Sequence, residues 1–170
     1  MMIKTKARKT TVIMLTVLLA LVLAACGDSG GSPAEADLFD THFDGYAEKE
    51  EVAVPDTDDQ VIVVKDGDGE TMGAVVYTAI AGYGGDIQLE VVLDRNYQVL
   101  ELNVLEHEES TGLGDGIESE DFRQQFVGKG PGDSYELDID IDTVTDATLS
   151  TKAVIQGVLN SMEQAEAAIQ

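Results

Sequence analysis

The sequence predicts one α+β domain, in which a twisted and mostly antiparallel sheet carries packed helices. Short segments rich in Val, Ile and Leu follow one another through the middle of the chain, separated by turns rich in Gly, Asp and Asn. Helical spacing of apolar residues occurs on both sides of these segments. Residues 26–170 are enough for one hydrophobic core but hardly for two.

The first 25 residues have the layout of a secretory signal, with basic residues before an apolar run from Val12 to Ala25. That run is short for a membrane span. It ends at Leu23-Ala24-Ala25-Cys26, which resembles the signal of bacterial lipoproteins, where the cysteine is lipidated and becomes the new N-terminus. An uncleaved anchor helix with an incidental cysteine is the alternative. We expect a domain that is lipid-anchored at Cys26 on the extracytoplasmic face of the cell membrane, with a signal peptide at 1–25, a flexible linker at 26–34 and the domain at 35–170.

Acidic residues dominate the chain, which has 33 Asp and Glu against 10 Lys and Arg and a net charge of −23. All 33 acidic residues but only six of the basic ones lie beyond Cys26, so the expected mature protein carries a charge of −27. We expect no nucleic acid partner, because binding nucleic acid requires Lys and Arg to neutralise phosphates. Such a charge suits a salty medium, in which repulsion among carboxylates is screened. Since Cys26 is the only cysteine, no intrachain disulfide is possible.

The first half of the domain predicts one helix and two hairpins. Helical spacing of Leu38, Phe39, Phe43 and Tyr46 predicts a helix within 35–54, before Pro55. Strands are expected at 61–64 and 72–80 around the Asp/Gly turn 65–70, and at 86–93 and 97–105 around the turn 94–96. The Asp/Gly turn lacks the ligand pattern of a calcium-binding loop, so turn formation explains its residues.

The second half predicts two helices and a strand. A short helix at 119–126, capped by Ser119, should bury Phe122 and Phe126. Acidic residues alternate with three apolar ones over 136–142, which is typical of a half-buried strand. The last helix has one apolar stripe, formed by Val154, Ile155, Val158, Leu159, Met162 and Ile169.

Thr148 lies where this expected strand meets the last helix, in a run rich in hydroxyl groups. The first N–H groups of a helix lack partners within the helix and face the positive end of its dipole, so a phosphate is favoured there. Capping of the helix by one hydroxyl is the alternative, and spacing alone favours capping because Ser and Thr are common N-cap residues. The hydroxyls of this turn belong to Thr145, Thr148, Ser150 and Thr151.

Three blocks occur in order along the chain: Gly82-Tyr83-Gly84-Gly85, Glu109-Ser110-Thr111-Gly112-Leu113-Gly114-Asp115, and Asp142-x-x-Thr145-x-Ala147-Thr148. They resemble the GYGG segment, the E-T-P-G-L-G-D loop and the flavinylation motif Asp-x-x-(Ser/Thr)-Gly-Ala-(Thr/Ser) of FMN-binding domains like those of the RnfG and NqrC subunits of bacterial redox pumps. The chain departs from the family at Ser110-Thr111, in place of Thr-Pro, and at Asp146, in place of Gly. Asp tolerates the left-handed backbone conformation, so Asp146 is compatible with the turn.

The resemblance implies a covalent FMN, joined by a flavin transferase to the Thr148 hydroxyl as a phosphodiester. It implies that Gly112, Leu113 and Gly114 offer backbone donors and a small apolar wall to the isoalloxazine ring, with Tyr83 lying against it. The other residues that it assigns to the cofactor are Gly84, Glu109, Thr111, Asp142, Thr145, Ala147 and Ser150.

No catalytic or metal-binding residue is expected. His107 has no Cys or second His nearby, and a lone histidine beside acidic residues is more often a surface residue than a zinc ligand. No Ser lies in a nucleophile elbow.

We therefore expect an electron carrier rather than an enzyme that turns over a small substrate, because the flavin supplies the redox chemistry and no acid/base pair is visible. Its partners would be the flavin transferase and membrane redox proteins. One alternative is a subunit of an ion-translocating membrane redox complex. Another is a module that binds flavin non-covalently or not at all, for which Asp146 is the best argument. Covalent attachment suits an acidic domain outside the cell, because anionic FMN would be repelled and lost by dilution.

Overall fold

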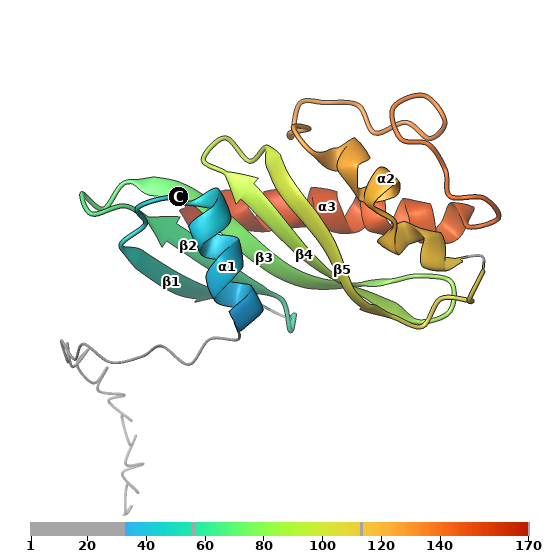
Figure 1. Cartoon of the computed structure of the whole chain (residues 1–170), viewed down its shortest axis with the longest axis horizontal. Coiled ribbons are helices and arrows are strands. Elements are labelled where there is room, and N and C mark those ends of the chain that lie inside the picture. The colour runs from blue at the N-terminus through green and yellow to red at the C-terminus, as the bar shows by residue number, and fades with distance from the viewer. Residues whose placement is uncertain (1–32, 56, 113, 170) are drawn as a thin grey trace, which may run out of the picture. The chain divides into compact units, whose positions relative to one another are not determined.

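The computed structural model describes residues 33–169 except 56 and 113. The predicted signal peptide, Cys26 and Leu113 lie outside the described residues. Five strands form one antiparallel sheet in the order β1-β2-β3-β4-β5 (Figure 1), which confirms the predicted α+β fold class. The strands are β1 Glu48–Ala53, β2 Gln60–Lys65, β3 Thr71–Ala81, β4 Asp86–Asp94 and β5 Val99–His107.

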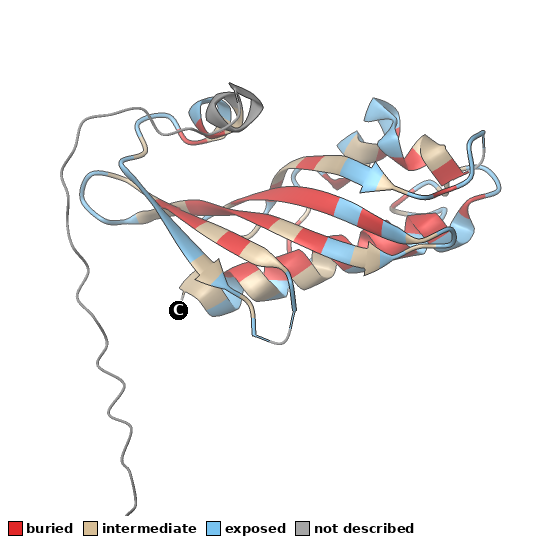
Figure 2. Cartoon of the chain, turned by 90° about the horizontal axis from the view of Figure 1, so that it is seen from below, coloured by how far each residue is buried: buried red, intermediate tan, exposed pale blue. Residues whose placement is uncertain are grey.

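Helices cover both faces of this sheet, and neighbouring residues of a strand belong to different cores. Val63 packs into the core under helix α3 (Thr148–Ile169), whereas Val64 packs into a smaller core under α1 (Pro33–His42). The same alternation separates Val91 from Val92, as expected from the period of two along a strand. Figure 2 shows α1 and α3 on opposite sides of the sheet, with buried residues along its central strands.

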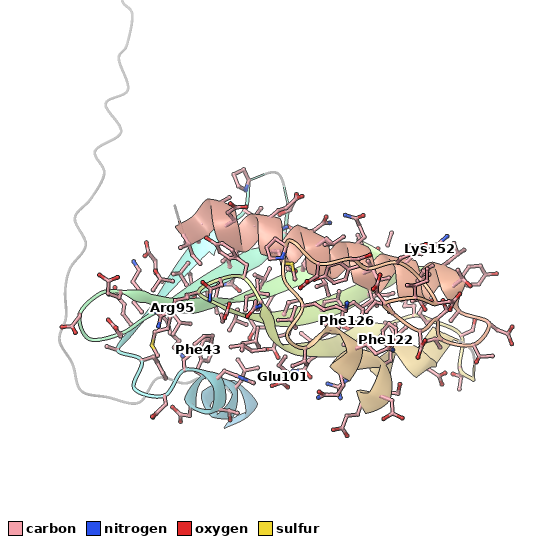
Figure 3. All side chains as sticks on the ribbon, turned by 90° about the horizontal axis from the view of Figure 1, so that it is seen from above. Phe43, Arg95, Glu101, Phe122, Phe126 and Lys152 are labelled. Atoms are coloured by element: carbon pink, nitrogen blue, oxygen red, sulfur yellow. The ribbon has the colours of Figure 1, made fainter. Side chains whose placement is uncertain are left out.

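Helix α3 packs closely on β3 and β4 because a glycine faces the sheet. A Cβ atom at Gly157 would lie 2.5 Å from Leu89 Cδ1 and 3.3 Å from Ile80 Cγ2. Beside α3, the same core is closed by the 3₁₀ helices η1 (Gly114–Glu118) and η2 (Gln124–Phe126) and the short helix α2 (Glu120–Arg123) between them. The predicted cap and burial are confirmed: Ser119 Oγ accepts from Phe122 N, and Phe122 and Phe126 are buried (Figure 3).

The predicted helix within 35–54 is correct only in its first part. Helix α1 ends at His42, Gly45 adopts a φ of +77°, and the chain then forms β1, which pairs with β2 along its whole length. β1 is an edge strand and almost entirely exposed, so its sequence lacks the apolar alternation by which a strand is recognised.

The predicted strand over 136–142 is wrong. This segment is a turn closed by a single bridge between Leu137 and Ile141. Its aspartates bond to the local backbone: Asp140 Oδ2 accepts from Glu136 N, and Asp138 Oδ1 accepts from Thr143 N. Asp138 also has a φ of +59°. Aspartate side chains that satisfy nearby N–H groups compete with a strand ladder, and here they outweigh the alternating pattern.

The other predicted strands and the last helix are confirmed with shifts of their ends. β5 begins at Val99 rather than at 97, since Tyr97 takes a φ of +63° in the preceding turn. Within the described part of the chain, no helix combines the length and the apolar character needed to cross a membrane.

Candidate functional site

One cavity brings together residues from all three sequence blocks. It encloses about 370 Å³ and lies between the turn after β3, the loop after β5 and the start of α3. Residues from these separate segments therefore form one site. They are Tyr83, Glu109, Ser110, Gly114, Asp146, Ala147, Thr148, Leu149 and Ser150.

The carboxylate of Glu109 connects the three segments. Its Oε1 accepts hydrogen bonds from the backbone N–H groups of Tyr83 at 2.7 Å and Gly84 at 3.2 Å. Its Oε2 accepts from Ser150 Oγ, in the first turn of α3, at 2.7 Å. Glu109 is only 7% exposed and Ser150 only 1%. The carboxylate therefore fixes the β3–β4 turn and the first turn of α3 to the end of β5.

The glycines of two blocks make room for this carboxylate. A Cβ atom at Gly82 would lie 2.1 Å from Glu109 Oε1, and one at Gly114 would lie 2.6 Å from Glu109 Cβ. At Gly84 a Cβ atom would lie 2.1 Å from the Glu108 carbonyl oxygen. The absence of a side chain at these glycines therefore lets their backbone lie close to the 108–109 segment.

Hydrogen bonds hold Glu109 in its charged form. Burial on its own would raise the pKa of this carboxyl, but bonds from Ser150 Oγ and from the N–H groups of Gly84 and Tyr83, with His107 nearby, lower the pKa below its ordinary value. A carboxylate that accepts several good donors stays ionised at neutral pH even when it is buried. The site thus contains a fixed negative charge.

His107 supports Glu109 from the protein side, and the expectation of a surface histidine is wrong. Its side chain is only 9% exposed, and Nε2 lies 2.8 Å from Glu118 Oε1. Its Nδ1 accepts from the Glu109 N–H at 3.0 Å. His107 thereby joins β5 to the segment 114–118 behind the cavity.

The start of α3 provides an exposed hydroxyl and free backbone donors. Thr148 is the first residue of the helix and is exposed. Thr151 Oγ1 accepts from Val144 N and donates to the Ala147 carbonyl, and Ser150 bonds Glu109. Among the hydrogen bonds of the described residues, none joins a hydroxyl of this turn to an N–H group of the first turn of α3. Capping therefore does not explain the cluster of hydroxyls.

Asp146 adopts the left-handed conformation, with a φ of +58°. The position thus needs the backbone that glycine takes most readily, and Asp supplies it, as predicted. Its exposed side chain places a carboxylate at the edge of the cavity, next to Thr148.

Several predicted cofactor residues lie outside this cavity. Gly112, Asp142 and Thr145 line a separate hollow of about 480 Å³, which also contains Asp115 and Gln125. Thr111 is exposed and lines neither hollow, and Gly84 only donates to Glu109.

The backbone N–H groups of Gly112 and Gly114, which the resemblance assigns to the cofactor, bond within their own loop in this structure. Gly112 N donates to Asp115 Oδ2, and Gly114 N donates to the Ser110 carbonyl oxygen. Both N–H groups therefore stabilise their own loop.

Sequence reasoning left Ser110, Asp146 and Leu149 out of the site, although all three line the cavity. Leu149 is the clearest omission, since this apolar side chain is 58% exposed at the rim, as Tyr83 is at 70%. The signal was available: Leu149 lies off the apolar stripe of α3, and an apolar residue on the wet face of a helix often marks a contact surface.

The segments that line the cavity lie within a region that is similar to known proteins. Residues 82–163 match the family model described as FMN-binding domain. The G subunit of the proton-translocating ferredoxin:NAD(+) oxidoreductase complex of Clostridium ljungdahlii is 34% identical over 101 residues, covering 56% of this chain and 54% of that protein. The G subunit of the ion-translocating oxidoreductase complex of Escherichia coli K12 is 37% identical over 108 residues, covering 58% and 52%. The chain spans about half the length of these curated relatives.

Among solved structures, the fold is similar to that of NqrC from Shewanella oneidensis. The TM-score is 0.52 at 19% sequence identity, and the match covers 78% of this chain and 77% of that one. At this identity the likeness concerns the fold alone.

Proposed function

We propose that this chain is a membrane-anchored extracytoplasmic electron carrier with FMN attached covalently to Thr148. The match of residues 82–163 to the FMN-binding domain model and the similarity to the curated G subunits support this proposal. The observation that supports this most is the exposed Thr148 hydroxyl at the start of α3, in a cavity shared by all three blocks. The volume of about 370 Å³ lies within the range of small-molecule pockets, about 300–1,000 Å³.

The residues around Thr148 fit the parts of FMN. The unpaired N–H groups and the dipole of the first turn of α3 favour the phosphate. Tyr83 and Leu149 offer exposed apolar surface to a flat ring. FMN supplies the redox chemistry when bound, and the protein supplies tethering and electrostatics. A phosphodiester to Thr148 removes dissociation, which the acidic character of the chain would otherwise promote.

This function requires a flavin transferase for maturation, membrane redox proteins as electron donor and acceptor, and a lipid anchor at Cys26. The lipobox-like Leu23-Ala24-Ala25-Cys26 supports the anchor, which would keep the flavin near membrane partners. Mass spectrometry of the N-terminal peptide from membranes tests it, with Cys26→Ser as the control that should release the protein from the membrane.

Thr148→Ala should abolish covalent flavin. The variant and the unaltered chain would be co-expressed with a flavin transferase and compared by in-gel flavin fluorescence and intact mass after denaturation. Thr148→Ser is the matched control, because it keeps a hydroxyl at the same position and should retain the mass increment. Retention of flavin by Thr148→Ala, or an unaltered chain that stays unmodified, refutes the covalent assignment.

A subunit of an ion-translocating redox complex is the second candidate, favoured by the names of the curated relatives. Affinity purification from gently solubilised membranes separates the two. A complex subunit retains integral membrane proteins in fixed stoichiometry, whereas a free-standing carrier is recovered without them.

A further inference from the structure

We infer that Glu109 places a fixed negative charge in the wall of the flavin pocket and thereby makes the attached flavin harder to reduce. This inference rests on the proposed function, because it concerns the flavin held at Thr148. It deepens that function by naming a residue that lowers the reduction potential.

The position of Glu109 is the first argument. The residue lines the cavity that contains Thr148, and it is 7% exposed. Asp146 lines the same cavity but is exposed, so water and salt screen its charge. Of these two carboxylates, Glu109 acts through the lower dielectric constant and has the stronger effect on a bound ring.

The second argument is that the hydrogen-bond donors to the Glu109 carboxylate are neutral groups. The donors to Glu109 are two backbone N–H groups and the Ser150 hydroxyl. In the described residues, no salt bridge joins Glu109 to a Lys, Arg or His, and the nearest imidazole, that of His107, faces Glu118. Neutral donors stabilise the carboxylate without cancelling its field in the cavity. The lowered pKa of Glu109 agrees with a charge that persists at neutral pH.

The charge of Glu109 affects the reduced flavin ring more than the oxidised ring. Uptake of two electrons and one proton by the neutral oxidised isoalloxazine ring leaves the ring with one negative charge. A carboxylate in the wall repels that charge but has little effect on the neutral ring. Glu109 therefore shifts the equilibrium toward the oxidised flavin and the reduction potential toward more negative values.

The test is a redox titration of the flavinylated protein with dithionite and mediator dyes at pH 7.5. Glu109→Gln removes the charge and keeps the shape, since its amide oxygen can accept from the N–H groups and its amide nitrogen can donate to Ser150 Oγ. Its reduction equilibrium should favour the reduced flavin by about tenfold more than that of the wild type, a shift of about 30 mV for a two-electron couple. Glu166→Gln is the charge-matched control at the exposed far end of α3, and its potential should equal that of the wild type.

Ser150→Ala distinguishes charge from geometry. It removes one hydrogen bond and keeps the carboxylate, so its potential should stay closer to that of the wild type than the potential of Glu109→Gln. Equal shifts in both variants, or no shift in Glu109→Gln, overturn the inference while the proposed function stands. A wild type that takes up no flavin overturns both.

If Glu109→Gln does not fold, an infrared measurement on the wild type tests the inference instead. Redox-difference infrared spectra should contain a carboxylate band that moves on reduction and that Ser150→Ala displaces. The absence of such a band overturns the inference.

Discussion

Glu109 gathers donors from the β3–β4 turn and from the first turn of α3, so its ionisation contributes to the stability of the fold. The pKa of Glu109 in the folded protein is below its ordinary value. The stabilisation is therefore fully present above the unfolded pKa, about 4.3 for a glutamate, and is lost as the pH falls through the lower folded pKa.

Acidification should thus reduce the stability of the wild type relative to Glu109→Gln. The free energy of unfolding of both proteins, without flavin, would be measured by urea titration between pH 7 and pH 3. Glu101 and Asp140 also have lowered pKa values, but both proteins contain them, so their effects cancel in the difference. A difference that does not change with pH contradicts the role given to the carboxylate, and Glu166→Gln should follow the wild type throughout.

At Asp146 the backbone conformation decides which substitutions are tolerated. The φ of +58° suits Gly, whereas a β-branched side chain is strained there. Asp146→Gly should be close to neutral, while Asp146→Val should cost about 1–2 kcal/mol in the free energy of unfolding. Thr145→Val is the control, because this neighbour is exposed and has no positive φ. Equal losses in both valine variants would show that the conformation at 146 is not the cause.

Removal of the Asp146 carboxylate should also help flavin attachment. Asp146→Gly restores the residue of the family motif and takes a negative charge away from the expected phosphate beside Thr148. The fraction of chains carrying the FMN mass increment, after limited co-expression with a flavin transferase, should therefore rise. Asp146→Asn removes the charge and keeps a residue that tolerates the left-handed backbone. If neither variant raises this fraction, the Asp146 carboxylate does not hinder the reaction.

At the scale of the elements, the sequence predicted the helices and strands whose apolar spacing matches the face that they bury in the fold. Strands β2 to β5 and helix α3 have apolar residues at the spacing of their buried faces, so their existence could be predicted. β1 could not, because it is defined by its pairing with β2 and buries little. The segment 136–142 has the alternation of a strand, yet the bonds of Asp138 and Asp140 to the backbone make it a turn.

For the site too, the sequence predicted the residues but not their contacts in the folded protein. Residues of the three blocks, whose glycines, threonine and acid stand at fixed spacing in the sequence, line one cavity. Their internal chemistry was not visible, since the bonds of Glu109 cross 26 and 41 positions of the chain. That Gly82 and Gly114 make room for the Glu109 side chain follows only from three-dimensional contacts.

Substitutions in the two hydrophobic cores, one on each face of the sheet, should affect the site differently. Phe43 belongs to the core under α1, and Phe126 belongs to the core under α3 (Figure 3). Phe→Ala at a buried position costs about 3–5 kcal/mol, so both variants should lose comparable stability. Only Phe126→Ala disturbs the segment whose Gln125 Oε1 accepts from Asp142 N at 2.6 Å, at the start of the block Asp142–Thr148.

We therefore expect Phe126→Ala to lower flavin attachment per folded molecule more than Phe43→Ala. Stability would be measured by urea denaturation, and attachment by flavin fluorescence relative to the amount of folded protein. Equal attachment in the two variants would indicate that the 119–126 segment does not support this block.

At the scale of the whole molecule, charge repulsion is the main unusual force. The chain has 33 acidic residues against 10 basic ones, and the described residues contain a single Lys–carboxylate salt bridge, Lys65–Glu50, beside two His–Glu pairs. Most carboxylates therefore lack a cationic partner, and a compact state brings them closer together than an unfolded chain does. Folding of the domain thus works against its own charge, and dissolved salt should relieve this effect.

The melting temperature should consequently rise by several degrees between 10 mM and 1 M NaCl, as the screening length falls from about 30 Å to about 3 Å. Most of the increase should occur below 200 mM, because screening changes fastest there, whereas general salting-out grows steadily with concentration. A variant with Glu51, Glu70 and Glu166 changed to Gln provides the control, since these exposed side chains belong neither to the cavity nor to a salt bridge among the described residues. With less repulsion to relieve, its melting temperature should begin higher at 10 mM NaCl and rise less. Identical salt responses in the two proteins would mean that the net charge does not limit the stability of this fold.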